Sequence, residues 1–289
     1  MNILVTGGTG TVGSAVVSEL LGRGVKVSVL TRNAASAERL PAGVEAVIGD
    51  LQSPETIRTA FTGKDAVFLL NAVSQTETNE GLMAVIGASL GGVRKIVYLS
   101  VPSIETAPHL PHFGSKMPVE FAIKRSGIAY SILRPNNFFQ NDLWFKDVIA
   151  GFGVYPQPIG SAGVSRVDVR DIAEAAASCL MGSENDGKEF HIAGPEALTG
   201  ERTAEIWSDA LGKQVVYGGD DMDAWEAQAK QMLPDWMAFD FRLMYEHFQR
   251  HGLKATAQEL DELAAILGHQ PRSFDDFARE TAAVWAAGE

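Results

Sequence analysis

Glycines near the N-terminus have the spacing that phosphate binding requires. Residues 1–13 read MNILVTGGTGTVG, and the glycines match both a GxGxxG and a GxxGxxG pattern. Such a segment turns tightly after a strand, lets the backbone approach a pyrophosphate, and lets the next helix pack closely. An ordinary glycine-rich turn is the alternative, but the strand before it and the helix after it favour phosphate binding at the helix N-terminus. The residues expected to contact a dinucleotide are Gly7, Thr9, Gly10, Thr11, Val12 and Gly13.

The residue after the second expected strand distinguishes between two coenzymes. A site for NAD usually carries Asp or Glu about 20 residues after the glycines, where it binds the ribose 2′-hydroxyl. Thr31-Arg32-Asn33 stands there instead. A guanidinium can pair with a 2′-phosphate and stack on adenine, whereas a carboxylate would repel that phosphate. The sequence therefore favours NADP(H) over NAD(H), with a solvated arginine as the alternative.

Two further strand ends are expected to line the coenzyme. Asp50 and Leu51 follow the third expected strand and are placed to line the adenine side. Asn71 and Ala72 follow the fourth expected strand and should run beneath the nicotinamide half. Plain strand-end turns are the alternative interpretation of both pairs.

Short β-branched runs alternate with helical patterns in the first half of the chain. The expected strands are Asn2–Thr6, Val25–Leu30, Val44–Ile48, Ala66–Leu70, Lys95–Ser100 and Ala129–Leu133. The expected helices lie near Val12–Arg23, Ser53–Phe61, Glu80–Leu90 and Met117–Ser126. This spacing implies right-handed crossovers and an α/β fold, with a Rossmann-type, doubly wound parallel sheet covered on both faces.

The alternation loosens after Pro135. A helix over Ile172–Met181, with Asp171 as its N-cap, and a strand near Phe190–Ala193 are expected to rejoin the sheet. Beyond Thr199 the pattern is almost wholly helical. We therefore expect an NAD(P)-binding core over residues 1–155 and a smaller, mostly helical C-terminal lobe over residues 156–289, with 164–195 returning to the core sheet. Ligands bind outside the carboxyl ends of the strands in open α/β sheets, so the lobe would cover the site.

Several segments together resemble the NmrA-like branch of the atypical short-chain dehydrogenases/reductases. They are TGGTGTVG, Arg32, Gly49-Asp50, Tyr98-Leu99-Ser100, Lys116, SGIAYSILRPNNFFQN and HIAGPEALT, and they span roughly Met1–Gly218. This branch includes NADPH-dependent quinone and azo reductases, isoflavone-reductase-like enzymes and redox-sensing regulators. The resemblance implies the Rossmann fold and binding of NADP(H), and it does not identify the substrate.

The catalytic pattern of this superfamily is altered here. Typical short-chain dehydrogenases carry Tyr-x-x-x-Lys, in which the lysine lowers the pKa of the tyrosine and the tyrosine donates a proton opposite the hydride. No tyrosine of this sequence lies four residues before a lysine, and the matching stretch is His112-Phe113-Gly114-Ser115-Lys116. Histidine can act as a general acid near neutral pH, and Lys116 can bind the ribose hydroxyls or the substrate oxygen.

Pro118 affects the geometry of this stretch, because proline is tolerated only in the first turn of a helix. The helix is expected to begin near Gly114 or Ser115, which puts His112 just before it. Ser100, at the end of the fifth strand, matches the position at which many relatives keep a catalytic serine. The catalytic candidates are therefore Lys116, His112 and Ser100. The alternatives are a surface helix entry for the first two and a strand-end hydroxyl without a role for Ser100.

Aromatic and amide side chains after the sixth strand suit a flat, conjugated substrate. The candidates are Asn136, Phe138, Phe139 and Trp144. Core packing is the alternative for the aromatic rings, and closure of a turn is the alternative for Asn136. Hydride transfer to a quinone or azo acceptor needs little proton delivery, because the product anion is stabilised by conjugation or protonated by water.

Composition argues against several other classes of protein. With 24 basic and 36 acidic residues, the net charge of −12 opposes binding to nucleic acid. No apolar run approaches the ~18 residues of a membrane span, and no secretory leader is expected. The single cysteine, Cys179, fits a reducing cytoplasm. No metal site is expected, because His247 and His251 lack a third ligand and the glutamate of an HExxH motif.

Two functions stay open at this stage. The first is an NADPH-dependent reductase of a small aromatic or conjugated substrate, which the aromatic residues favour. The second is a non-catalytic NADP(H)-binding redox sensor that acts through a protein partner, which the missing tyrosine favours. A sugar-nucleotide epimerase would share the fold but needs that tyrosine. A monomer and a homodimer are both compatible with the sequence.

Overall fold

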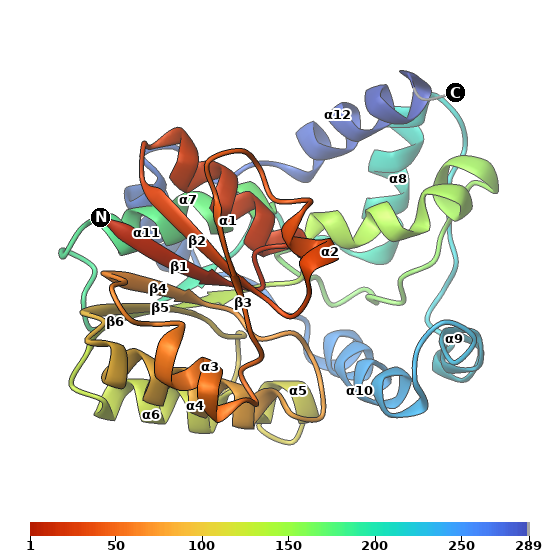
Figure 1. The fold of residues 1–289 in the computed structure, drawn as a ribbon. Helices are drawn as coiled ribbons and strands as arrows, with labels where there is room; N and C mark the ends of the chain where they lie inside the picture. Colours follow the sequence, from red (N-terminus) through yellow and green to blue (C-terminus); the bar gives the residue numbers. More distant parts are fainter. Residues whose placement is uncertain (288–289) are drawn as a thin grey trace. The chain divides into compact units, whose positions relative to one another are not determined.

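Seven parallel strands form the sheet that the β-branched runs predict (Figure 1). Their order is β3-β2-β1-β4-β5-β6-β8. They are β1 (Asn2–Thr6), β2 (Lys26–Thr31), β3 (Glu45–Ile48), β4 (Ala66–Leu69), β5 (Lys95–Leu99), β6 (Ala129–Pro135) and β8 (Lys188–Ile192). The strands expected in the first half of the chain are confirmed to within a residue or two. β8 pairs with β6, so the chain returns to the sheet after Pro135.

Helices cover both faces of this sheet, as a doubly wound fold requires. α1 (Thr11–Gly22) and α7 (Val169–Met181) pack against each other on one face (Figure 1). α3 (Pro54–Thr59), α4 (Glu77–Gly91) and α6 (Met117–Arg125) lie on the other face. Two short helices, α2 (Ala34–Ala37) and α5 (Pro111–Gly114), follow β2 and precede α6 respectively. The expected fold class is confirmed.

Three expected helix starts differ from the structure, and one of them is α4, which begins at Glu77 where the sequence predicts a start near Glu80. α7 begins at Val169, so Asp171 lies within its first turn, where the helix dipole favours a carboxylate, and is not its N-cap. α6 begins at Met117, because a separate short helix ends at Gly114 and Pro118 occupies the first turn of α6. Lys116 is the N-cap residue of α6.

The core beneath α3, α4 and α6 combines strand residues that face the same side of the sheet with residues of the segments that cover it. Side chains alternate between the two faces along a strand, so each strand contributes every second residue to this layer. The buried members include Leu4, Leu30, Phe61, Val67, Ile96, Val119 and Ile132. Burial of this apolar surface stabilises the sheet. The sheet in turn holds the positions of the loops that follow the carboxyl ends of its strands.

The computed structural model describes residues 1–287 and divides into two units that interleave along the chain. The first unit, which contains the seven-stranded sheet, comprises residues 1–135, 169–192 and 265–267. The second unit comprises residues 136–168, 193–264 and 268 onward. The boundary expected after residue 155 stays a prediction.

Helices make up most of the second unit. They are α8 (Gly200–Leu211), α9 (Met222–Ala229), α10 (Asp235–His251), most of α11 (Ala257–Leu267) and α12 (Phe274–Ala287). A 3-10 segment at Phe139–Phe145 leads into a π-helical turn at Asp147–Gly151. β7 (Val154–Tyr155) then pairs in parallel with β9 (Val216–Tyr217).

Candidate functional site

The glycine-rich turn follows β1, at the point where the strand order of the sheet reverses. β1 lies between β2 and β4, and open α/β sheets bind ligands at this position. Gly7 has a φ of +64°, and its carbonyl oxygen accepts a hydrogen bond from the Gly10 N–H at 3.0 Å. α1 then starts at Thr11 with Gly10 as its N-cap residue and without a side-chain cap. The N–H groups of the first turn of α1 are therefore available to an anion.

Close packing between α1 and this turn depends on Gly13. A Cβ on Gly13 would lie 2.1 Å from the carbonyl oxygen of Gly7 and 2.8 Å from the Cα of Gly8. No side chain can occupy such positions without moving the backbone. The exposed members of the turn are Thr9, Gly10 and Thr11. The structure thus gathers the residues predicted to bind a diphosphate into one turn.

Two arginines follow β2, Arg32 directly after the strand and Arg39 seven residues later. Arg32 is exposed, and among residues 1–287 no hydrogen bond or ion pair involves its guanidinium. Asn33 caps α2 by accepting a hydrogen bond from the Ser36 N–H at 2.8 Å. A hollow of about 290 Å³ is lined by Gly8, Thr9, Ser14, Val17, Arg39, Leu40 and Pro41. The sequence analysis does not predict Arg39 as a coenzyme-binding residue. The one feature of the sequence that could indicate it is that it is a second basic residue shortly after β2.

Asp50 and Leu51 shape the turn that follows β3. The Asp50 carboxylate accepts a hydrogen bond from the Gln52 N–H at 2.8 Å, and the Asp50 N–H donates to Thr56 Oγ1 at 3.0 Å. Leu51 is buried in the core cluster of the first unit. The Asp50 side chain therefore stabilises a strand-end turn, and its contact with adenine stays a prediction.

Asn71, one of the residues predicted to contact the coenzyme, lies after β4 and has a buried side-chain amide without hydrogen bonds to any described residue. It is 7% exposed, and within residues 1–287 neither Oδ1 nor Nδ2 of its amide has a hydrogen-bond partner. A buried amide without partners costs free energy, so a ligand group that pairs with it would bind favourably. Ala72, the next residue, is exposed.

Lys116 lies in a buried polar cluster on the α4 and α6 side of the sheet. Its ammonium donates to Glu77 Oε1 at 2.5 Å, and Ser115 Oγ donates to Glu77 Oε2 at 3.0 Å. The Lys116 nitrogen is 5.7 Å from the ring centroid of Tyr98. His112, in the short helix α5, is buried with its ring edge-on to that of Phe113. The sequence did not reveal Glu77, because it lies 39 residues from Lys116.

Tyr98 brings a tyrosine close to Lys116 by folding rather than by a Tyr-x-x-x-Lys motif. Its side chain is fully buried, and its hydroxyl has no hydrogen-bond partner within the described part of the chain. Burial raises the pKa of the Tyr98 hydroxyl well above its usual value, and the Glu77 and Glu120 carboxylates raise it further. Tyr98 therefore stays protonated and enclosed, unlike the proton-donating tyrosine of typical short-chain dehydrogenases.

Ser100 is held by a buried ion pair after β5. Its Oγ donates to Glu120 Oε1 at 2.5 Å, and Arg134 donates from Nε to Oε1 at 3.1 Å and from Nη2 to Oε2 at 2.7 Å. Burial opposes ionisation of Glu120, but the hydrogen bonds from Arg134 and Ser100 lower its pKa below the usual value. The Ser100 hydroxyl thus donates its proton in a hydrogen bond to the Glu120 carboxylate. A catalytic role for this hydroxyl stays a prediction.

The residues predicted to contact substrate all belong to the second unit, and they differ in exposure. The Asn136 amide donates to the carbonyl of Leu253 at 2.8 Å and accepts from the Asn137 N–H at 2.7 Å, and its contact with substrate stays a prediction. Phe139 is enclosed against Phe274 and Phe277, with ring centroids 5.0 Å and 5.5 Å away. It is a core residue in this conformation. The two rings that remain accessible are Phe138, which is half-buried, and Trp144, which is 74% exposed.

An ion pair between Arg166 and Asp142 is fully buried in the second unit. Arg166 Nη2 lies 2.6 Å from Asp142 Oδ1, and both side chains are 0% exposed. Arg166 also donates from Nε to Asn137 Oδ1 at 3.0 Å and from Nη2 to the Phe138 carbonyl at 2.7 Å. Burial opposes the charged form, but the Asp142 carboxylate raises the pKa of Arg166 above its usual value. This pair fixes the segment that carries the substrate candidates.

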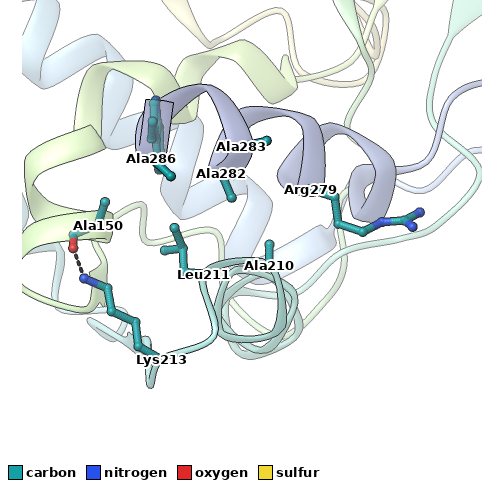
Figure 2. A pocket seen from close by; sticks show the side chains of 9 residues that line it. Ala150, Ala210, Leu211, Lys213, Arg279, Ala282, Ala283 and Ala286 are labelled. Atoms are coloured by element: carbon teal, nitrogen blue, oxygen red, sulfur yellow. Dashed lines mark hydrogen bonds between the residues drawn. The ribbon is translucent and has the colours of Figure 1, made fainter. Parts of the chain in front are cut away.

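A larger hollow of about 400 Å³ lies elsewhere in the second unit, between α8 and α12 (Figure 2). Figure 2 shows alanines of α12 facing α8 across it. Its two cations are already engaged: Lys213 donates to the Ala150 carbonyl, and Arg279 pairs with Asp276. The small side chains offer no specific contacts to a ligand, and Lys213 and Arg279 already have partners within the protein. We therefore assign no binding site here.

The membrane expectation and the environment of the single cysteine can also be compared with the structure. Within residues 1–287, no helix has both the length and the apolar character needed to cross a membrane. Cys179 is buried in α7, and burial raises the pKa of its thiol to about 11, so it stays protonated at neutral pH. A reactive role for this cysteine is therefore disfavoured.

A glycine turn at the switch point of a doubly wound parallel sheet defines a dinucleotide-binding type of α/β fold. Comparison with known proteins narrows this class. The NmrA-like family model matches residues 1–278, and the chain belongs to this family.

Individual relatives are similar over almost the entire chain. An NAD(P)H azoreductase of Xenophilus azovorans is 31% identical over 289 residues, which cover 99% of each chain. A (4-alkanoyl-5-oxo-2,5-dihydrofuran-3-yl)methyl phosphate reductase of Streptomyces griseus is 32% identical over 98% of this chain and 99% of its own. Among solved structures, the NADPH complex of an NADPH-dependent quinone oxidoreductase from Escherichia coli matches with a TM-score of 0.86 and 24% identity, covering 96% of this chain and 99% of its own.

Proposed function

We propose that this protein is an NAD(P)H-dependent oxidoreductase that reduces a conjugated acceptor such as a quinone or an azo compound. The observation that carries the proposal is the uncapped N-terminus of α1 behind the glycine turn, at the switch point of the sheet. Two relatives that match 98–99% of this chain are named as reductases, one of them an NAD(P)H azoreductase.

The residues present fit a nicotinamide dinucleotide. The N–H groups of the glycine turn would hold the diphosphate, and a Cβ at Gly13 would fill the space that the turn needs. The unpartnered amide of Asn71 would pair with the nicotinamide half. The Lys116 ammonium would bind a ribose hydroxyl or the acceptor oxygen. When bound, the reduced coenzyme supplies a hydride to the acceptor.

The side chains near Lys116 favour an acceptor that needs little help with protonation. Tyr98 is buried with a raised pKa, and His112 is enclosed in α5. Neither side chain is accessible as a proton donor in this conformation. A quinone or an azo compound accepts a hydride into a conjugated system, and water can then deliver the proton. This requirement supports a conjugated acceptor over a simple ketone.

The first test is oxidation of NADPH, followed by absorbance, with a panel of quinones and azo dyes. Wild-type protein is expected to turn over at least one acceptor, and Lys116→Met is expected to lower kcat/KM by about 100-fold, as loss of a positioned polar group does. Lys188→Met, at an exposed position of β8, is the matched control and should keep wild-type activity. Failure of wild-type protein to oxidise NADPH with any acceptor would refute the oxidoreductase proposal.

A second prediction concerns coenzyme preference. If Arg32 and Arg39 pair with the 2′-phosphate, Arg32→Ala should raise the Kd for NADPH by about 10- to 100-fold, and Arg39→Ala by a smaller factor. The Kd for NADH should change little, because NADH lacks this phosphate. Arg58→Ala, on the exposed side of α3, is the control. Equal losses for NADPH and NADH would place neither arginine at the 2′-phosphate.

The second candidate function is a redox sensor that binds NADP(H) without turnover. The missing Tyr-x-x-x-Lys pair and the enclosure of Tyr98 favour this alternative. Tight binding of NADPH, measured by fluorescence titration, together with no turnover on the whole acceptor panel, would support the sensor.

A further inference from the structure

Glu77 is an ionisable side chain of the Lys116 cluster to which the proposed function gives no role. It is the first residue of α4 and is 1% exposed. Removing a carboxylate from water is strongly unfavourable unless partners compensate for the lost hydration. The sequence predicts a helix near Glu80–Leu90, so Glu77 lies outside every expected element.

Both carboxylate oxygens of Glu77 are occupied by the segment that carries Lys116. Oε1 accepts from the Lys116 ammonium and Oε2 accepts from Ser115 Oγ. Thr78, the next residue of α4, donates from Oγ1 to the Ser115 carbonyl at 2.7 Å. The start of α4 therefore binds this segment through two consecutive residues, and the orientation of the carboxylate is fixed at both of its oxygens.

The Lys116 ammonium is held in place by Glu77, but not all of its N–H donors have acceptors within the described residues. Its side chain is 6% exposed, with Glu77 Oε1 at 2.5 Å and the Tyr98 ring centroid at 5.7 Å from its nitrogen. An ammonium carries three N–H donors. Among residues 1–287, Glu77 is its one hydrogen-bond acceptor, so donors remain for a ligand. The buried pair of Arg134 and Glu120 differs, since it is closed by two parallel hydrogen bonds.

We propose that Glu77 is a positioning residue: its carboxylate, oriented by Ser115, holds the Lys116 ammonium where the remaining donors meet the bound coenzyme or acceptor. This inference rests on the proposed function. Glu77 itself touches neither ligand, and its effect passes through Lys116. Loss of Glu77 should therefore impair binding and turnover only as far as Lys116 contributes to them.

A double-mutant cycle on Glu77→Gln and Lys116→Met tests this, with the Kd for NADPH from fluorescence titration and kcat as readouts. Each single variant should weaken NADPH binding by about 10-fold or lower kcat by at least that factor. The double variant should be no worse than Lys116→Met alone. Glu80→Gln, in the same first turn of α4, is the matched control and should match the wild type.

Thermal stability separates positioning from a purely structural role. Lys116→Met leaves a buried unpaired carboxylate and should lower Tm by about 10 °C, whereas the double variant should regain most of that loss. Positioning thus predicts that stability recovers in the double variant while binding and turnover do not. Additive effects on Kd and kcat, or wild-type Kd and kcat in folded Glu77→Gln, would overturn the inference.

The outcomes also distinguish this inference from the proposed function. If wild-type protein binds NADPH but reduces no acceptor, the oxidoreductase proposal fails and the cycle in Kd still decides the role of Glu77. If it reduces acceptors but the cycle is additive, only the inference about Glu77 fails. If wild-type protein binds neither NADPH nor NADH, both are refuted.

Discussion

Replacement of Asp142 by alanine is expected to lower the free energy of unfolding by about 3–5 kcal/mol, because it leaves the Arg166 guanidinium buried without its counter-ion. Asp142 accepts hydrogen bonds from Arg166 and from the indole of Trp207, the latter at 2.9 Å. Urea denaturation followed by tryptophan fluorescence measures the loss, since Trp207 lies in the network itself. A decrease below about 1 kcal/mol would show that the pair is not needed for folding.

Two further variants separate the charge from the packing. Asp142→Leu combined with Arg166→Met removes both charges and should recover most of the stability lost in Asp142→Ala, because no desolvated charge is left unpaired. Arg250→Ala removes a surface pair with Glu246, in which Arg250 is 69% exposed, and should cost no more than about 0.5 kcal/mol. If the double variant is as unstable as Asp142→Ala, then the loss of stability in Asp142→Ala results from altered packing and not from an unpaired charge.

Gly13→Ala should weaken coenzyme binding by at least about 100-fold while the chain still folds. The added methyl group would overlap the carbonyl oxygen of Gly7, so α1 must move away from the turn that presents its N–H groups. Such overpacking typically costs about 1–3 kcal/mol of stability. The diphosphate contacts depend on the geometry that is lost, and the Kd for NADPH should rise by at least about 100-fold. Calorimetric titration measures this change.

Gly22→Ala is the matched control for this prediction. Gly22 is the last residue of the same helix, and a Cβ built there would meet nothing within 4 Å. Alanine restricts the unfolded chain more than glycine does, so stability should rise by up to about 1 kcal/mol with no change in Kd. Wild-type NADPH binding by Gly13→Ala would contradict the assignment of the turn.

The fold could be predicted closely because its signals are local. β-branched runs, the glycine pattern and the spacing of apolar residues each act over a few neighbouring positions. The start of α4 differs from the prediction for the opposite reason: Glu77 and Thr78 carry no apolar periodicity, and both are bound by a distant segment around Ser115. Likewise, α6 starts late because α5 precedes it as a separate turn.

The candidate site was only partly predictable, because its buried charges find their partners far along the chain. Glu77 lies 39 residues from Lys116, Glu120 lies 14 residues from Arg134, and Asp142 lies 24 residues from Arg166. No local pattern encodes such pairs. The glycine turn could be predicted since its residues are contiguous. Contacts of Lys116, His112 and Ser100 with a ligand stay predictions, as do those of the substrate candidates.

The interleaved path of the chain limits how this protein can be divided. A fragment ending at Pro135 would include the glycine turn and β6, but it would lack β8 and α7, which come from residues 169–192. One edge of its sheet would present unpaired backbone groups, and the face that α7 covers would be left bare. Such a fragment is expected to self-associate, so truncation at Pro135 should not yield the nucleotide-binding half as a stable, autonomous module.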